Sequence, residues 1–417
     1  MKKLIALLLA CLMIAGIFAG CSQTEDKGSV YYLNFKPEFD TALQELAAKY
    51  TEKTGIEVKI VTAASGNYND TLTANIKDIT IFNIGNAAAL ADWDEYALDL
   101  TGSDIAKELT TNDFNLYNAA GELKAIGNCY ESFGIIVNTK LLEQAGHSLS
   151  EIKDFASLKA VVEDIHANAA TLGFDAFTTS GLQPSSSWRF SGHLATLPLH
   201  YEGVKSSVAT ISGSKLDLFK NTWDLYINNA AAAPSSLTGE SDAAAEFKAG
   251  KAVFYQNGTW EYSGLKEAGM TDDQLAMIPI YCGAEGEQNA ALCSGTENCW
   301  AINAKASKAD QQASIDFLVW LVSDPEASAV YVQQLGAVPF KNCPASTNKF
   351  VADGNAMLAE GKTSISWAFN YTPNVDAWRA TVVTALAAYS AGTGTWEDVV
   401  TAFVDGWAYE YGVVNGN

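Results

Sequence analysis

Carboxylates, amides and aromatic rings are the side chains of this chain that could do chemistry, because motifs for other chemistries are missing. No serine stands in a GxSxG nucleophile elbow, and no EF-hand loop or glycine-rich phosphate loop is present. The histidines never form an HExxH motif and the cysteines never form paired CxxC ligands. The sequence therefore predicts no metal site and no cofactor.

Polar and aromatic residues follow the ends of three predicted strands near the N-terminus. In chain order they are Asn34, Lys36, Glu38, Ser65, Tyr68, Asn83 and Asn86. Ligands of open α/β sheets bind beyond the carboxyl ends of the strands, so these positions are candidate ligand contacts. A capping or packing role explains each of them about as well.

The elements that must position these residues alternate between strands and helices. Residues 30–35 (VYYLNF) predict a strand, residues 39–51 a helix and residues 57–61 a second strand. This β-α-β unit implies a parallel strand pair with a right-handed crossover. Further strands are predicted at residues 79–84 and 132–137, with helices at residues 140–145, 155–170 and 214–228. The fold class is α/β, and roughly 390 residues after the leader are too many for one usual core, so two lobes are expected.

The N-terminus has the organisation of a secretory signal. Lys2 and Lys3 precede an apolar run at residues 4–18, which is followed by Ala19-Gly20-Cys21. A cysteine at this place resembles the bacterial lipoprotein signal, which implies that residues 1–20 are removed and that lipid on Cys21 anchors the protein to the extracellular face of the cell membrane. Residues 21–29 are then a flexible linker. The alternative is an ordinary secreted protein that is cut nearby.

Charge and cysteine content restrict the partners and the covalent links. The formal charge of −22 becomes −24 once Lys2 and Lys3 leave, and such a surface repels nucleic acid. Five cysteines remain after Cys11 and Cys21 are set aside, so they cannot all pair. Cys282 and Cys293 could form a disulfide outside the cell, or all five could be isolated thiols.

Residues 247–260 (FKAGKAVFYQNGTW) are the most specific motif of the chain. They resemble the F-x-x-G-K-A-A-M-x-x-x-G-x-W signature of the extracellular carbohydrate-binding proteins of ABC importers. Three other segments match the same family in its order: residues 131–146 (ESFGIIVNTKLLEQAG, with VNTK an inexact version), residues 300–304 with 315–325, and residues 335–340 (LGAVPF). The resemblance covers almost the whole mature chain.

The resemblance implies two α/β lobes that are joined by crossing strands and close over a sugar. The crossings are expected near residues 135–138, 300–304 and 338–341. Lobe 1 is then residues 30–136 and 302–340, and lobe 2 is residues 137–301 and 341–417. The resemblance also implies a monomer that delivers its sugar to the permease subunits of an ABC importer.

Sugar chemistry and the resemblance together select the site residues. A pyranose ring has apolar faces and a rim of hydroxyls, so it is bound by flat aromatic rings and by polar groups. Trp260 matches the stacking tryptophan of the family, although a packed lobe residue is the alternative. Glu131 lies where the family places a hinge carboxylate, and Lys36 with Glu38 resembles its charged pair. Glu261, Trp188 and Trp367 are further candidates. Aromatic residues in several loops suggest that more than one sugar ring is covered, which favours an oligosaccharide over a monosaccharide.

Two other function classes are alternatives to a binding protein. A glycoside hydrolase needs two carboxylates roughly 5 to 10 Å apart, and Glu131 with Glu261 or Glu38 could be imagined in those roles. Nothing in the local sequence marks them as acid and nucleophile, so no enzymatic activity is expected. A surface adhesin that binds polysaccharide would usually be a β-sandwich, and the helix-rich alternation argues against it.

Overall fold

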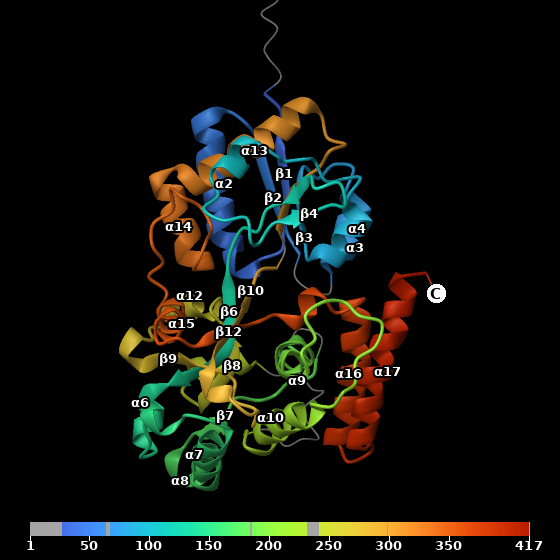
Figure 1. The fold of residues 1–417 in the computed structure, drawn as a ribbon. Coiled ribbons are helices and arrows are strands. Elements are labelled where there is room, and N and C mark those ends of the chain that lie inside the picture. Colours follow the sequence, from blue (N-terminus) through green and yellow to red (C-terminus); the bar gives the residue numbers. More distant parts are fainter. Residues whose placement is uncertain (1–26, 64–66, 184–185, 232–241, 298, 417) are drawn as a thin grey trace, which may run out of the picture.

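The computed structural model describes residues 27–63, 67–183, 186–231, 242–297 and 299–416. The predicted lipidation site Cys21 and the candidate ligand contact Ser65 therefore lie outside the described residues. Figure 1 shows two α/β bodies, one above the other, with the chain running between them several times. We call the upper body the first lobe and the lower body the second lobe. The predicted α/β class and two-lobed organisation are confirmed.

The first lobe is built on a four-stranded sheet of order β11-β3-β1-β2. Its strands are β1 (Val30–Asn34), β2 (Val58–Thr62), β3 (Ile81–Ile84) and β11 (Cys299–Ile302). Strand β1 pairs in parallel with β2 and β3, and α2 (Asp40–Thr54) connects β1 to β2, as the β-α-β pattern predicts. Helix α2 ends at Gly55, whose φ of 75° lies in the left-handed region that favours glycine. The other helices of this lobe are α3 (Tyr68–Asn75), α4 (Ala87–Trp93), α5 (Asp104–Lys107), α13 (Lys308–Ser323) and α14 (Pro325–Leu335).

The second lobe is built on a sheet of order β12-β10-β6-β8-β7, with β9 paired to β6. Its strands are β6 (Glu131–Asn138), β7 (Asp175–Phe177), β8 (Ala252–Gly258), β9 (Leu275–Ile278), β10 (Ala290–Gly295) and β12 (Thr363–Ser366). Its helices include α6 (Thr139–Gln144), α7 (Phe155–Ala167), α8 (Ala169–Leu172), α9 (Ala195–Glu202), α10 (Leu216–Asn228), α11 (Ala243–Lys248), α12 (Glu261–Glu267), α15 (Lys349–Ala359), α16 (Val375–Ser390) and α17 (Trp396–Val414).

Each lobe has its own hydrophobic core. The largest cluster lies in the second lobe, where the fully buried rings of Trp223, Trp378 and Trp407 pack α10, α16 and α17 against one another. In the first lobe, Trp300 and Tyr331 pack among α2, α13 and α14. Separate cores are what a chain of this length requires, and they leave the space between the lobes for a ligand.

The chain passes between the lobes outside the strands themselves. Ile126 still bridges to Trp300 in the first lobe, and β6 begins at Glu131 in the second lobe. The next passage lies between the end of β10 at Gly295 and the start of β11 at Cys299. The crossing predicted at residues 135–138 falls within β6, and the one predicted at residues 300–304 falls in β11 and the two residues after it. Residues 338–341 are still bonded to the first lobe, where Phe340 bridges to Leu109 and the Lys341 N–H donates to the Glu108 carbonyl oxygen at 2.9 Å. An apolar run continues through its sheet and does not mark where the sheet begins.

The described cysteines, namely Cys129, Cys282, Cys293, Cys299 and Cys343, are all free thiols, and only Cys343 is not buried. Of the two possibilities for Cys282 and Cys293, the structure thus has the isolated thiols. Within the described ranges, no helix combines the length and the apolar character that crossing a membrane requires.

Candidate functional site

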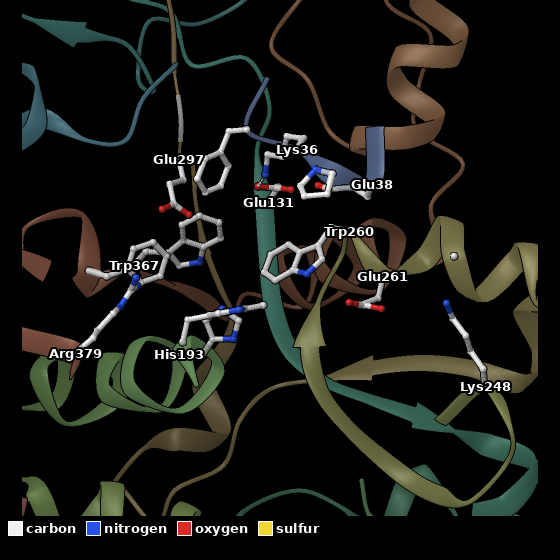
Figure 2. Close-up of a pocket in the computed structure, with 15 residues that line it drawn as sticks. Lys36, Glu38, Glu131, His193, Lys248, Trp260, Glu261, Glu297, Trp367 and Arg379 are labelled. Carbon is white, nitrogen blue, oxygen red and sulfur yellow. Dashed lines mark hydrogen bonds and ion pairs between the residues drawn. The ribbon is translucent and has the colours of Figure 1, made fainter. Parts of the chain in front are cut away.

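A cavity of about 470 Å³ lies between the two lobes (Figure 2). The first lobe contributes to it the loop after β1, which is residues 35–38. The strand ends, helices and loops around the second lobe supply the rest, and the connection from β10 to β11 supplies Glu297. The site is therefore asymmetric, with one loop of the first lobe facing a wall built mainly by the second.

Most of the residues that the sequence proposes as ligand contacts come together in this cavity. The ones that line it are Lys36, Glu38, Glu131, Trp188, Trp260, Glu261 and Trp367. They come from five segments that are far apart in the sequence: the loop after β1, the start of β6, the segment before α9, the end of β8 and the end of β12. Their role as ligand contacts stays a prediction.

Four other proposed contacts do not line the cavity. Asn34 is fully buried, and its amide donates to the Lys36 carbonyl oxygen at 2.8 Å, so it shapes the loop that presents Lys36. The Tyr68 hydroxyl donates to the Leu33 carbonyl oxygen at 3.2 Å and accepts from a backbone N–H of β3 at 2.6 Å. Asn83 is buried on β3, and Asn86 accepts a hydrogen bond as the N-cap of α4. The side chains of Asn34, Tyr68 and Asn86 are here used to satisfy nearby backbone groups.

Aromatic rings form one wall of the cavity. Trp260 is half-buried at the start of α12, and its ring centroid lies 6.1 Å from that of Trp188 and 6.5 Å from that of Trp367. Trp367 is only 3% exposed, and its indole N–H donates to the Cys293 carbonyl oxygen at 2.9 Å. Trp260 and Trp188 therefore offer the open ring surface, while Trp367 supports the wall from within the core.

Gly258 makes room for Trp260. A Cβ atom at Gly258 would lie 2.2 Å from the Trp260 ring, which is far below any tolerated contact. We expect Gly258→Ala to displace the ring and to weaken ligand binding at least tenfold, because the aromatic wall loses its flat face. Calorimetric titration measures the loss. Gly406→Ala is the matched control, since Gly406 lies in α17 and does not line the cavity, and its Cβ would meet Trp378 at an ordinary contact distance of 3.5 Å. Equal affinities for the two variants would contradict the packing argument.

An ion pair joins the first lobe to the strand that begins the second. The Lys36 ammonium donates to Glu131 Oε2 at 2.5 Å, and the two side chains are only 10% and 2% exposed. Burial lowers the pKa of Lys36, but the charge and the hydrogen bond of Glu131 outweigh it and raise this pKa above its ordinary value. The Lys36 ammonium is thus held in its charged form. Glu131 Oε1 is also buried and has no hydrogen-bond partner among the described residues.

Glu38 lines the cavity beside this pair (Figure 2) and is an exposed residue. Partial desolvation in the cavity raises the pKa of its carboxyl to about 7. The charged groups that face it are Lys36, which lowers this pKa, and Glu131 and Glu261, which raise it. Glu38 therefore exchanges its proton near neutral pH.

This pKa predicts how binding depends on pH. A ligand that donates a hydrogen bond to Glu38 binds its ionised form, so affinity is full above pH 7 and is lost as the pH falls through about 7. We expect affinity to drop up to about tenfold between pH 8 and pH 6. At pH 6 the unbound Glu38 carries a proton, which it must release before the ligand can bind the ionised carboxylate. Calorimetric titration at the two pH values checks this, and Glu38→Gln should flatten the profile. An unchanged pH dependence in that variant would assign the proton to another group.

His193 is a site residue that the sequence does not reveal. It lies in a π-helical turn, Arg189–Leu194, of a kind that often occurs at functional sites. Its ring stacks on Phe133 at 3.8 Å, and Nδ1 lies 2.8 Å from the Gln256 amide nitrogen, which donates to it. Burial, followed by the charges of Arg379 and Arg189, lowers the pKa of His193 well below its usual range. The neutral ring then has its proton on Nε2 and offers a donor at the cavity.

Charged residues at the two ends of the cavity are also missed by the sequence. Arg379 of α16 lies with its guanidinium carbon 5.0 Å from the Phe369 ring centroid and forms an ion pair with Asp376 at 3.7 Å, while Glu297 also lines this end of the cavity. Lys248 of α11 lines the opposite end near Glu261. No local pattern marks these residues, because each lies in an ordinary helix or loop segment and only the fold brings them to the cavity.

Comparison with known proteins agrees with this geometry. Residues 45–359 match the family model described as bacterial extracellular solute-binding protein. No curated relative matches the sequence significantly.

Solved structures share the fold at low sequence identity. RafE in complex with raffinose is 18% identical with a TM-score of 0.70, and the match covers 91% of this chain and 99% of that one. Maltose-bound MalE3 of T. maritima is 16% identical with a TM-score of 0.70 and the same coverage. Lmo0181 of Listeria monocytogenes in complex with cycloalternan is 14% identical with a TM-score of 0.68, and the match covers 93% and 99%. The family model spans most of the chain and the fold is that of two-lobed binding proteins, so this chain belongs to the family of bacterial extracellular solute-binding proteins.

Proposed function

We propose that this protein captures a carbohydrate, and more specifically an oligosaccharide, in the cavity between its lobes and delivers it to the permease of an ABC importer. The observation that carries the proposal is the facing arrangement of Figure 2, in which the rings of Trp260, His193 and Trp367 lie opposite a row formed by Glu38, Glu131 and Glu297. Flat rings bind the apolar faces of pyranoses, and carboxylates accept hydrogen bonds from their hydroxyls.

The size of the cavity and the similar structures support the same ligand class. A volume of about 470 Å³ falls within the roughly 300 to 1,000 Å³ of small-molecule sites. The similar proteins include complexes with raffinose, maltose and cycloalternan. These ligands contain more than one ring, in keeping with the several aromatic side chains of this cavity.

The protein binds its ligand without converting it under this proposal. A retaining glycoside hydrolase needs a free carboxylate as its nucleophile, whereas Glu131 Oε2 is already bound to Lys36. None of the residues that line the cavity belongs to a recognisable catalytic motif. These features favour a binding role over hydrolysis.

A thermal-shift screen of the mature chain tests the proposal. The panel contains mono- and oligosaccharides, with amino acids, short peptides and nucleosides as other solute classes. We expect at least one oligosaccharide to raise the melting temperature and to be recovered unchanged after incubation. Stabilisation by another solute class alone would overturn the ligand class, and new reducing ends would overturn the binding-only role.

The anchoring of the protein is a separate part of the proposal. We expect lipid on Cys21 to hold the protein at the membrane, because residues 1–21 resemble the bacterial lipoprotein signal. Replacing Cys21 by Ser should release the protein from the membrane fraction into the medium, which immunoblotting of both fractions measures. Cys11→Ser is the matched control and should leave the distribution unchanged. Retention of the Cys21→Ser variant in the membrane fraction would refute the anchor.

A further inference from the structure

The two sides of the cavity offer a ligand different hydrogen-bonding groups. On one side lie the carboxyl groups of Glu38, Glu131 and Glu297 (Figure 2), and an ionised carboxylate can only accept hydrogen bonds. A sugar also carries oxygens that need donors. His193 lies in the aromatic wall opposite these carboxyl groups, so the position of its ring proton decides what that wall offers.

Packing fixes the orientation of the His193 ring. The ring stacks on that of Phe133, with the two centroids 3.8 Å apart and the two planes 7° apart. Its centroid lies 5.0 Å from that of Trp188 and 5.7 Å from that of Trp260. The whole residue is 3% exposed. The two ring nitrogens are therefore held in fixed directions.

Gln256 occupies one of these nitrogens. Its amide nitrogen lies 2.8 Å from His193 Nδ1, and an amide nitrogen can only donate, so Nδ1 accepts and carries no proton. The neutral ring then has its proton on Nε2. Among the described residues Nε2 has no hydrogen-bond partner, and it is not one of the sealed polar atoms. The Nε2–H donor is thus left for a molecule in the cavity.

The surroundings of Gln256 support this direction of the hydrogen bond. Gln256 is 2% exposed and lies in β8 opposite Ile135, and its backbone carbonyl oxygen accepts from Arg189 Nη1 at 3.0 Å. Its side-chain Oε1 is buried without a partner among the described residues. Turning the amide round would leave an NH₂ group without a partner instead, and buried N–H groups without a partner are rarer than such carbonyl groups.

We propose that Gln256 is a positioning residue for ligand binding, which holds His193 as the Nε2–H tautomer so that its ring donates to an accepting oxygen of the bound sugar. Gln256 does not line the cavity itself and acts through His193. A sugar that placed no acceptor at this point would leave the Nε2–H group desolvated and unpaired, which is costly. The inference rests on the proposed carbohydrate-binding function and adds one requirement for its ligand.

Nitrogen-resolved NMR of the ligand-free mature chain at pH 8 reads the tautomer, because bare and protonated ring nitrogens give different signals. The chain has four histidines, and loss of one set of signals in His193→Phe assigns the set of His193. We expect a bare Nδ1 and a protonated Nε2 in the wild-type ring. In Gln256→Glu the new carboxylate accepts from Nδ1–H, so Nε2 should be bare. A wild-type ring with its proton on Nδ1 would overturn the proposal.

Calorimetric titration at the same pH measures what the tautomer does for binding. The probes are raffinose and maltose, which are bound in two of the similar structures, and each further sugar that the thermal-shift screen returns. Gln256→Glu should weaken binding at least about tenfold. His193→Phe keeps an aromatic ring and removes the donor, so it should cause a similar loss and provides a second test if Gln256→Glu does not fold.

Gln288→Glu is the matched control. Gln288 is an exposed residue of the second lobe that does not line the cavity, and its substitution adds the same charge. The control should keep the wild-type histidine signals and the wild-type affinity. An equal loss of affinity in the control would overturn the assignment to Gln256, because added charge alone would then explain the loss.

Affinity and the proton on Nε2 must change together. A Gln256→Glu ring that carries protons on both nitrogens should keep its affinity, since the Nε2–H donor is retained. Unchanged affinity with a bare Nε2, or in His193→Phe, would overturn the donor role and leave the carbohydrate proposal intact. Failure of every sugar to bind the wild-type protein would overturn the proposed function, whereas the NMR signals of the ligand-free protein decide the tautomer without any sugar.

Discussion

Trp260→Ala should weaken carbohydrate binding by about 2 to 4 kcal/mol, which is roughly 30- to 1,000-fold in Kd. The indole is half-buried at the start of α12 and presents its ring to the cavity among Trp188, His193 and Trp367. A sugar stacked there covers an aromatic face that alanine cannot offer. Calorimetric titration of the variant with the sugar found in the screen measures the loss.

The melting temperature of the ligand-free variant shows whether Trp260 acts as a platform or as core. Trp93→Ala is the matched control, because Trp93 is also half-buried but packs against Phe82 and Tyr96 in the first lobe. We expect the control to lose stability and to keep its affinity. A Trp260→Ala protein that binds normally but melts much earlier would assign Trp260 to the core.

Lys36→Met should destabilise the ligand-free protein by about 3 to 5 kcal/mol, the usual cost of removing one partner of a buried ion pair. Glu131 is 2% exposed and would keep a negative charge with no cation beside it. Urea denaturation measures the change.

Two further variants test whether the loss of stability arises because the ion pair is buried. Lys36→Met combined with Glu131→Gln removes both charges and should recover most of the stability. Lys49→Met breaks the exposed pair with Glu326 and should cost no more than about 1 kcal/mol. If Lys36→Met were no more harmful than Lys49→Met, the buried pair would not be a structural link between the loop after β1 and β6.

Local patterns in the sequence are enough to predict the architecture but not the passages between the lobes. The alternation in residues 30–61 predicts β1, α2 and β2 because each has a clear period and Gly55 ends the helix. The crossing points cannot be predicted in this way, since residues 133–137 of β6 are all buried and their pattern marks no crossing. Which residues leave a sheet depends on tertiary pairing, and the pairing is not encoded in the hydrophobic period.

The residues of the candidate site can likewise be predicted from the sequence only in part. Trp260 and Glu131 can be found because they lie in segments with a motif, and the structure brings both to the cavity. Arg379 and His193 lie in helical segments without a motif, so only the packing of α16 and of the π-helical turn reveals them. Tyr68 illustrates the opposite case, in which a plausible platform residue after a strand turns inward and binds backbone groups of its own lobe.

A crystal structure of the mature chain with the carbohydrate identified in the screen is the most direct test of the central claim. We predict a pyranose ring stacked on Trp260 between the two lobes, with its polar groups bonded to Glu38 and Glu131 Oε1. A carbohydrate bound elsewhere on the molecule, with only solvent in the cavity around Trp260, would contradict this account.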